Sequence, residues 1–366
     1  MDGIFLARPD DVPTHGIPLG VKDLFDTAGL TTTYGSIVFA DHVPERSADA
    51  VTRLERAGYV DVGKTNLHEF AYGVTSQNAH FGTVPNPVAP GRTAGGSSGG
   101  SAAALAAGLV DAALGTDSGG SIRIPAGFCG VVGFKPTFGL VSLDGVFPLA
   151  PTFDHAGPMG RSVADCVRMM EALVPRFDLP AAVTPRIGVA WLEHCEPLVR
   201  ERVQQAAERV NAEPVAFPLP EGLSPMFMWE VASVHRDLFA EHADAYGDNV
   251  RIKIEHCLAV SEAEHEAAAK RRAEYRERAD EALQGFDLLL TPTLGFVAPS
   301  ADVDEHEWRE RTIRFTLAFN ALGWPALALP AGSAEDGLPA SVQLVGRSGD
   351  DALVLAAGAS LERGTP

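Results

Sequence analysis

The sequence predicts an α/β fold built as a single domain. Strand-like and helix-like segments alternate along the chain, which favours helices layered on a sheet. No internal repeat, long low-complexity tract or linker divides the 366 residues, although a chain of this length is also compatible with two smaller domains. Apolar residues make up 46% and charged residues 21% of the chain, as expected for a globular protein with a substantial core.

The first elements follow one another as strand, helix and strand. We expect a short strand over residues 16–23, then a helix over 48–57 that ends at Gly58, then a strand over 59–63. The following segment, 64–73, is predicted to begin another helix.

Two turns rich in glycine and serine flank the next helix–strand unit. The first turn, GGSSGGS at 95–101, ends a loop-rich stretch and leads into a small-residue helix over 101–108. A buried strand over 110–115 then reaches the second turn, GTDSGGSIRIPA, at 115–126. Another strand-like piece follows at 129–137.

The second half of the chain predicts further alternation. The expected helices are 163–173, 201–210, most of 225–284 and 351–362, and the expected strands are 186–191, 287–291, 325–330 and 341–345. A charged run late in 225–284 is typical of a solvated helix face with opposite charges one turn apart.

Charge and composition exclude several classes of function. The formal net charge is −19, which argues against nucleic acid or an anionic membrane as a partner. The acidity is most simply a solubility feature, and a cationic substrate is the weaker alternative. The N-terminus lacks a signal-peptide pattern, and no apolar run approaches the ~18 residues of a membrane span.

The cysteines and histidines indicate neither disulfides nor a metal site. Cys129, Cys166, Cys195 and Cys257 are scattered and form no C-x-x-C pair, so we expect buried thiols in a reducing cytoplasm. The chain has no H-E-x-x-H motif and no Cys/His cluster. We therefore expect no metal and no cofactor.

The Gly/Ser turns are the segments that point to chemistry. GGSSGGS is a single unit that leads directly into a helix, unlike a flexible linker, and no lysine follows it as a phosphate loop requires. In the second turn, successive N–H groups from Ser118 through Gly119 and Gly120 to Ser121 suit a developing oxyanion. Ser121 at its edge would be placed to attack a carbonyl held there.

A serine nucleophile needs a base, and no histidine lies in a suitable motif. Lys22 ends an apolar strand beside Asp23. A lysine serves as a base only where burial or cationic neighbours lower its pKa toward neutrality. Taken alone, such a strand-end lysine is more often a surface charge.

Several separated motifs, in the same order, strongly resemble the amidase-signature family. They are GIPLGVKD, GKTNLHEFAYGVTSQNAHFG, NPVAPGRTAGGSSGGSAAALAAG, GTDSGGSIRIPAGFCGVVGFKPT and FDHAGPMGRSVADC, with looser similarity in LLLTPT, FNALGWPALALP and GLPASVQLVG. The resemblance covers nearly the whole chain. It implies one amidase domain over 1–366, with a signature core at about 60–172, and a large mixed central sheet covered by helices on both faces.

The resemblance also implies a Ser–cisSer–Lys triad of Ser121, Ser97 and Lys22. Ser121 would be the nucleophile, and Ser97, preceded by a cis peptide bond, would relay a proton between Ser121 and neutral Lys22. Ser98 and Ser101 would then be structural. The implied activity is hydrolysis of a small carboxamide to a carboxylic acid and ammonia or an amine.

Further residues receive supporting roles by the same resemblance. Asp117 and Arg123 would stiffen the Ser121 turn, and Asp154 would lie behind the site, although purely structural contacts explain all three equally well. The residues expected near the acyl pocket are Tyr72, Thr75, Ser76, Gln77, Phe319 and Asn320.

Two departures and two other functions remain open. Only 21 residues precede Lys22, and the segment 174–230 is short compared with larger members of the family. We expect a more open pocket or altered oligomer contacts, or a natural protein that is longer than this sequence. A homodimer is one arrangement left open. The chain would alternatively be the A subunit of a glutamyl-tRNA(Gln) amidotransferase, although RIGVAWLEHCEP replaces the Y-D-G-V-R-Y-G-like segment that such proteins carry. A non-catalytic amide-binding protein is the third hypothesis.

Overall fold

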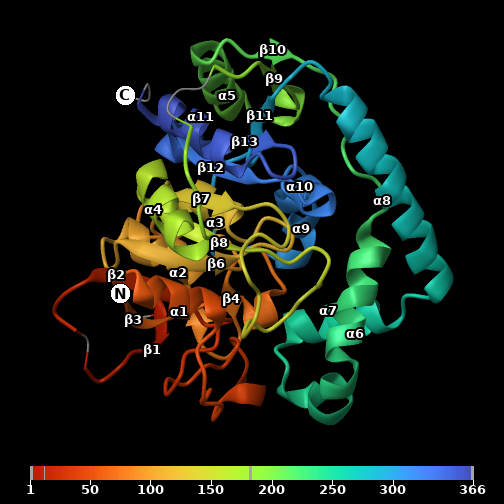
Figure 1. Cartoon of the computed structure of the whole chain (residues 1–366). Helices are drawn as coiled ribbons and strands as arrows, with labels where there is room; N and C mark the ends of the chain where they lie inside the picture. Colours follow the sequence, from red (N-terminus) through yellow and green to blue (C-terminus); the bar gives the residue numbers. More distant parts are fainter. Residues whose placement is uncertain (1–2, 12, 181–183, 364–366) are drawn as a thin grey trace.

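The computed structural model describes residues 3–11, 13–180 and 184–363. Within them, eleven strands form one mixed sheet in the order β1-β3-β2-β6-β8-β7-β12-β13-β11-β9-β10, with helices on both faces (Figure 1). The strands are β1 (Phe5–Ala7), β2 (Ile17–Lys22), β3 (Tyr59–Thr65), β6 (Ala112–Thr116), β7 (Val132–Lys135), β8 (Ala156–Gly160), β9 (Ile187–Val189), β10 (Glu213–Pro214), β11 (Leu288–Pro292), β12 (Ala326–Ser333) and β13 (Pro339–Gly346). The predicted α/β fold with a large mixed sheet is confirmed.

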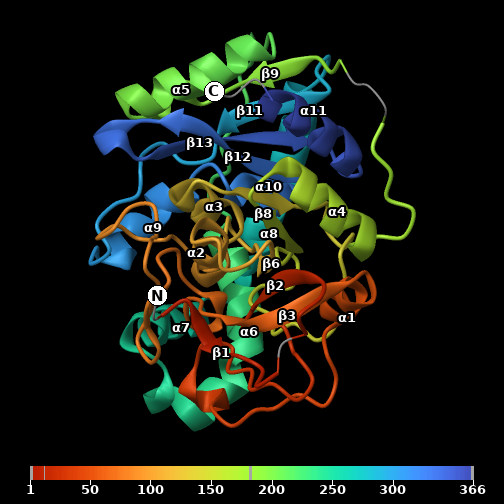
Figure 2. The same cartoon turned by 90° about the vertical axis from the view of Figure 1, so that its left-hand side faces the viewer.

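The helices divide between the two faces of the sheet. They are α1 (Asp49–Arg56), α2 (Gly99–Ala106), α3 (Arg123–Cys129), α4 (Val163–Leu173), α5 (Pro197–Arg209), α6 (Ser224–His242), α7 (Asp248–Leu258), α8 (Glu262–Ala282), α9 (Glu305–Ile313), α10 (Leu317–Leu322) and α11 (Asp351–Arg363). Helices α1, α4, α5 and α11 cover one face, and Figure 2 shows α1 and α4 on the opposite side of the sheet from α2 and α3. A separate two-stranded ribbon joins β4 (Gln77–Asn78) to β5 (Gly82–Thr83).

The core follows from the two-residue period of the strands. In β11, Leu288 and Leu290 pack in the cluster beneath α4, α5 and α11. Leu289, between them, packs on the opposite face with residues of α6, α7 and α8. The strand is therefore apolar throughout because both of its faces are covered. Helices α6, α7 and α8 extend along one side of the molecule (Figure 1).

The sheet places the two Gly/Ser turns beside the end of β2. Strand β6 is parallel to β2 and adjacent to it, so both strands end at the same edge of the sheet. Lys22 is the last residue of β2, and Thr116 is the last residue of β6. Helix α2 packs closely because it starts with glycines: a Cβ on Gly100 would lie 2.3 Å from the Asn66 carbonyl oxygen.

Two local predictions are wrong for reasons of tertiary contact. Residues 64–73 form no α-helix: β3 continues to Thr65, and only a 3-10 turn, Glu69–Ala71, follows. The Phe70 N–H donates to the Tyr34 carbonyl at 2.9 Å instead of to its own turn, and Phe70 has φ of 50°. Residues 123–126 are predicted to belong to the second glycine-containing turn, but they begin the wholly buried helix α3.

Candidate active site

Lys22 is completely buried at the end of β2. Its Nζ lies 2.7 Å from Ser97 Oγ, 3.0 Å from Ser98 Oγ and 2.7 Å from Thr116 Oγ1. No carboxylate forms an ion pair with it among the residues that the structure describes. Lys22 is thus not the surface charge that an isolated strand-end lysine would suggest.

Burial lowers the pKa of Lys22 to about 7, against an ordinary value of 10.5. The more distant charges of Asp117 and Asp154 act in the opposite direction and offset only part of this effect. Three hydroxyl partners suit a neutral amine, which has two N–H donors and one lone pair. The amine is therefore available as a proton acceptor near neutral pH.

Ser97 lies in the turn that precedes α2, and the Gly96–Ser97 peptide bond is cis. The Ser97 carbonyl accepts hydrogen bonds from Ser76 Oγ at 3.3 Å and from the His68 N–H at 3.3 Å. Ser76 Oγ also accepts from the Gly99 N–H at 3.2 Å. These contacts fix the Ser97 side chain toward Lys22.

Ser121 follows β6 in the second turn, next to the turn that carries Ser97. The two turns are joined directly, because the Ser98 N–H donates to the Ser121 carbonyl at 3.1 Å. Ser121 is 6% exposed and lines a pocket. Within the described part of the chain, its hydroxyl forms no hydrogen bond, so the oxygen is free to meet a ligand.

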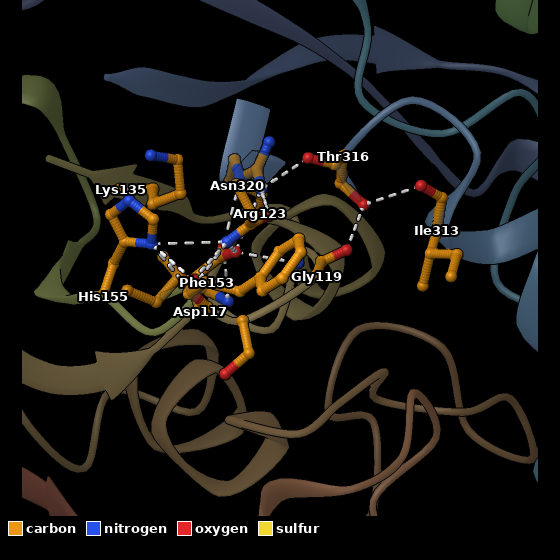
Figure 3. Close-up of polar contacts among 12 residues, drawn as sticks. Asp117, Gly119, Arg123, Lys135, Phe153, His155, Ile313, Thr316 and Asn320 are labelled. Carbon is orange, nitrogen blue, oxygen red and sulfur yellow. Dashed lines mark hydrogen bonds and ion pairs between the residues drawn. The ribbon is translucent and has the colours of Figure 1, made fainter. Parts of the chain in front are cut away.

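A buried ion pair holds the Ser121 turn in shape (Figure 3). The Asp117 carboxylate accepts from Arg123 Nε and Nη2, each at 3.0 Å. Arg123 also donates to Gln343 Oε1 at 2.9 Å and to Asn320 Oδ1 at 2.7 Å. Burial alone would raise the pKa of Asp117, but Arg123 holds that pKa well below its ordinary value.

The turn presents backbone N–H groups to the pocket with one exception. The Gly120 N–H donates to Asp117 Oδ1 at 2.8 Å, so it is not available to an oxyanion, which corrects the prediction for that residue. The N–H groups of Ser118, Gly119 and Ser121 have no acceptor among the described residues. All three of these residues line the pocket.

Asp154 supports the turn from behind. It accepts from Ser118 Oγ at 2.5 Å and from the Leu149 N–H at 2.9 Å. Burial raises its pKa, while these hydrogen bonds partly oppose the rise.

The pocket has a volume of about 290 Å³, at the small end for ligand sites. Apolar side chains from several elements line it, together with the polar turn that carries Ser121. The lining residues are Ala71, Tyr72, Gly73, Val74, Ser118, Gly119, Ser121, Leu149, Ser224, Phe227, Met228, Lys253, His256, His306, Arg309, Glu310, Ile313 and Leu317.

Of the six residues expected in the pocket, Tyr72 alone lines it. Asn320 is fully buried and bonds to Asp117 and Arg123 (Figure 3). Phe319 is also fully buried, and its ring centroid lies 5.7 Å from that of Trp191. Both residues are therefore packed in the protein interior and do not line the pocket.

The remaining three expected pocket residues brace the loops around Ser97. Thr75 Oγ1 donates to Gln77 Oε1 at 3.2 Å, and Gln77 Nε2 donates to the Ala301 carbonyl at 2.7 Å. Ser76 bonds to the Ser97 turn, as described above. These three side chains therefore support the site without lining the pocket.

Several residues at the site carry no clear sequence signal. Thr116 directly precedes Asp117 in the second turn, and its contact with Lys22 follows only from the pairing of β6 with β2. Lys253 lies in the segment 225–284, which is predicted to be mostly helical, and Arg309 lies in no predicted element, yet both line the pocket.

Lys253 is buried in a paired arrangement at the pocket wall. Its Nζ lies 2.8 Å from Glu305 Oε2, and burial lowers its pKa to about 8. Glu305 also accepts from the Val74 N–H at 3.2 Å. The Lys253 charge is therefore largely matched by Glu305.

Three further observations concern metal binding, membrane-spanning helices and the cysteines. In the described ranges, no group of three or more His, Cys, Asp or Glu side chains is arranged to hold a metal ion. No described helix is long and apolar enough to span a bilayer. All four cysteines are buried free thiols.

Comparison with protein families finds a match over most of the chain. The family model described as Amidase matches residues 6–355. AmiD of Mycobacterium tuberculosis, named as an inferred amidase, is 33% identical, and the match covers 96% of this chain and 80% of AmiD. The glutamyl-tRNA(Gln) amidotransferase A subunit of Anaeromyxobacter dehalogenans is 35% identical, and the match covers 95% of this chain and 82% of that protein.

Solved structures give the same result. The crystal structure of an amidase superposes with a TM-score of 0.89 at 40% identity, and covers 96% of this chain and 85% of that one. The glutamyl-tRNA(Gln) amidotransferase A subunit of Thermotoga maritima superposes with a TM-score of 0.84 at 30% identity. That match covers 99% of this chain and 87% of the other. The similarity thus extends over the whole fold.

Proposed function

The chain belongs to the amidase-signature family, a family of hydrolases of amide C–N bonds, and we propose that it hydrolyses a small carboxamide with Ser121, Ser97 and Lys22. Ser121 is the nucleophile, Ser97 the proton relay and Lys22 the base. The products are a carboxylic acid and ammonia or an amine.

Acylation begins when the Ser121 hydroxyl attacks the amide carbon. Its proton passes to Ser97, whose own proton passes to the neutral Lys22 amine. The carbonyl oxygen becomes an oxyanion, and the N–H groups of Ser118, Gly119 and Ser121 stabilise it. As the tetrahedral intermediate collapses, the relay returns the proton to the departing nitrogen, and the C–N bond breaks.

Deacylation repeats these steps with water. The relay removes a proton from water as its oxygen attacks the ester carbon of acylated Ser121. The same N–H groups stabilise the second oxyanion. Collapse releases the carboxylic acid, and Ser121 recovers its proton.

One observation supports this assignment above the others: Lys22 is buried among hydroxyl groups without a carboxylate partner in the described chain. A lysine with a carboxylate neighbour would stay protonated, because the opposite charge favours the ammonium form. The Ser97 hydroxyl is 2.7 Å from Nζ, within reach for direct proton transfer.

Turnover of small amides by designed variants tests the proposal. We expect ammonia release by the unmodified protein, and at least a ~1,000-fold loss of kcat/KM in both Ser121→Ala and Lys22→Ala. The control variant is Lys270→Ala, because the Lys270 side chain is 80% exposed on α8. Full activity in Lys22→Ala would exclude Lys22 as the base.

A second candidate is favoured by the relatives named as A subunits of glutamyl-tRNA(Gln) amidotransferases. In that role, the same serine would release ammonia from glutamine within a complex. Glutaminase activity is measured with the chain by itself and with the B and C subunits of a related amidotransferase. Activity on simple amides without partners favours the stand-alone amidase, whereas glutaminase activity that requires the partners favours the amidotransferase role.

A further inference from the structure

Arg309 lies in the same pocket as Ser121, on the inner face of α9. His306, Arg309, Glu310 and Ile313 all line this pocket, at the spacing of one helix face. The Arg309 guanidinium carbon is 5.4 Å from the Tyr72 ring centroid and 5.9 Å from that of Phe227. The side chain is thus held over the apolar wall of the pocket.

Arg309 is half-buried and forms no ion pair in the described part of the protein, although its charge helps to lower the pKa of Glu305. Its Nε is buried and has no hydrogen-bond acceptor, and no carboxylate forms an ion pair with it. Glu305, one turn earlier, is occupied by Lys253 Nζ, the Val74 N–H and Asn249 Nδ2. Glu310 is an exposed residue.

The two aromatic rings do not satisfy these donors. A cation–π contact uses the face of the guanidinium, and ~6 Å is the outer limit of such contacts. The N–H groups lie in the guanidinium plane, so the buried Nε–H still requires an acceptor. A buried donor without an acceptor is costly, and a missing ligand is one recognised explanation for it.

We propose that Arg309 binds a carboxylate of the amide substrate, so that the enzyme prefers carboxylated amides to neutral ones. A carboxylate matches the guanidinium with two parallel hydrogen bonds, and one of its oxygens satisfies the buried Nε. This inference rests on the proposed amidase function, because it places the carboxylate and the scissile amide in one cavity. It also names Arg309 as a residue that determines specificity.

Binding to the Ser121→Ala protein tests the inference without turnover. Calorimetry compares glutaramic acid, which carries a carboxylate on its acyl side, with pentanamide, its neutral analogue. We expect glutaramate to bind about 10- to 100-fold more tightly. Adding Arg309→Gln should reduce this ratio to below about 3-fold, and Arg309→Lys, which keeps the charge but not the planar fork, should give an intermediate ratio.

Arg311→Gln provides the matched control on the same helix. Arg311 pairs with Glu196 at 2.6 Å and does not line the pocket, so the ratio should stay at its original value. The inference is overturned if the carboxylate gives no gain in affinity in this pair or in the amine-side pair described next, or if Arg309→Gln leaves the gain unchanged.

A second pair of ligands shows whether the preferred carboxylate lies on the acyl side or on the amine side of the amide. N-Pentanoylglycine, with its carboxylate on the amine side, is compared with N-propylpentanamide in the same variants. A preference here that Arg309→Gln removes also supports carboxylate binding by Arg309, with the charge on the leaving group. Turnover is scored separately: an unmodified protein that hydrolyses none of the four amides contradicts the proposed function, while the binding ratios still decide the role of Arg309.

Discussion

Replacing Lys22 with methionine should make the protein more stable at pH 7 while it abolishes turnover. Lys22 is buried without a carboxylate partner in the described chain, so its folded environment disfavours the ammonium form. In the unfolded chain the same lysine is solvated and remains protonated up to about pH 10.5. Folding at pH 7 therefore carries the cost of removing that proton or of burying the charge.

The size of this cost follows from the pKa. A fall from 10.5 to about 7 corresponds to about 5 kcal/mol at 1.36 kcal/mol for each pH unit. Methionine avoids this cost and fills a similar volume, but it loses three hydrogen bonds to hydroxyl groups, worth about 1 kcal/mol each. We expect Lys22→Met to raise the free energy of unfolding by about 2 kcal/mol at pH 7.

The sign of the pH dependence distinguishes this account from a simple packing effect. Between pH 7 and 10.5 the unfolded state binds the proton that the folded state lacks, so the unmodified protein gains stability as pH rises. The advantage of Lys22→Met should shrink by about 5 kcal/mol over this range and change sign. Urea unfolding of both proteins at several pH values measures the difference, with exposed Lys270→Met as the control. A Lys22→Met protein that is less stable at pH 7, with a difference independent of pH, would refute the reasoning.

Three further predictions concern the base and the turn that carries Ser121. The kcat/KM for a neutral amide should fall below about pH 7 as Lys22 becomes protonated, and a pH–rate profile that is flat from pH 5 to 9 contradicts this. Arg123→Met should destabilise the fold by about 3–5 kcal/mol, because it leaves Asp117 buried and unpaired; denaturant unfolding measures the loss. Gly120→Ala should be clearly destabilising, since its Cβ would lie 2.3 Å from Thr316 Oγ1 at a φ of +128°. Gly119→Ala, whose nearest new contact is 3.7 Å away, should cost less than about 1 kcal/mol, and equal losses in the two glycine variants would contradict this.

Elements with strong local signals are predictable from the sequence. Helix α4 occupies the predicted residues, because Ser162 and Asp165 cap its first turn reciprocally. The parallel pairing of β2 with β6 brings Lys22, Thr116 and the Ser97 turn together. The motifs name Lys22 and Ser97, but the distance between them depends on this pairing.

Features that depend on distant contacts are not predictable in this way. Residues 64–73 favour a helix locally, but the Tyr34 carbonyl takes the Phe70 N–H and ends the regular pattern. Asn320 is expected to contact a ligand, yet the buried Asp117–Arg123 pair uses its amide. Nothing in the sequence near Arg309 indicates a pocket residue. Its place in the pocket follows only from the packing of α9 near Tyr72.

The central claim is that Ser121 is the nucleophile, and covalent labelling tests it most directly. A fluorophosphonate probe reacts with an activated serine, and mass spectrometry of the digested protein locates the adduct. We predict a single adduct on Ser121, much slower labelling in Lys22→Ala, and none in Ser121→Ala. An adduct on Ser97, Ser98 or Ser118 instead, or amide hydrolysis that continues in Ser121→Ala, would contradict the account.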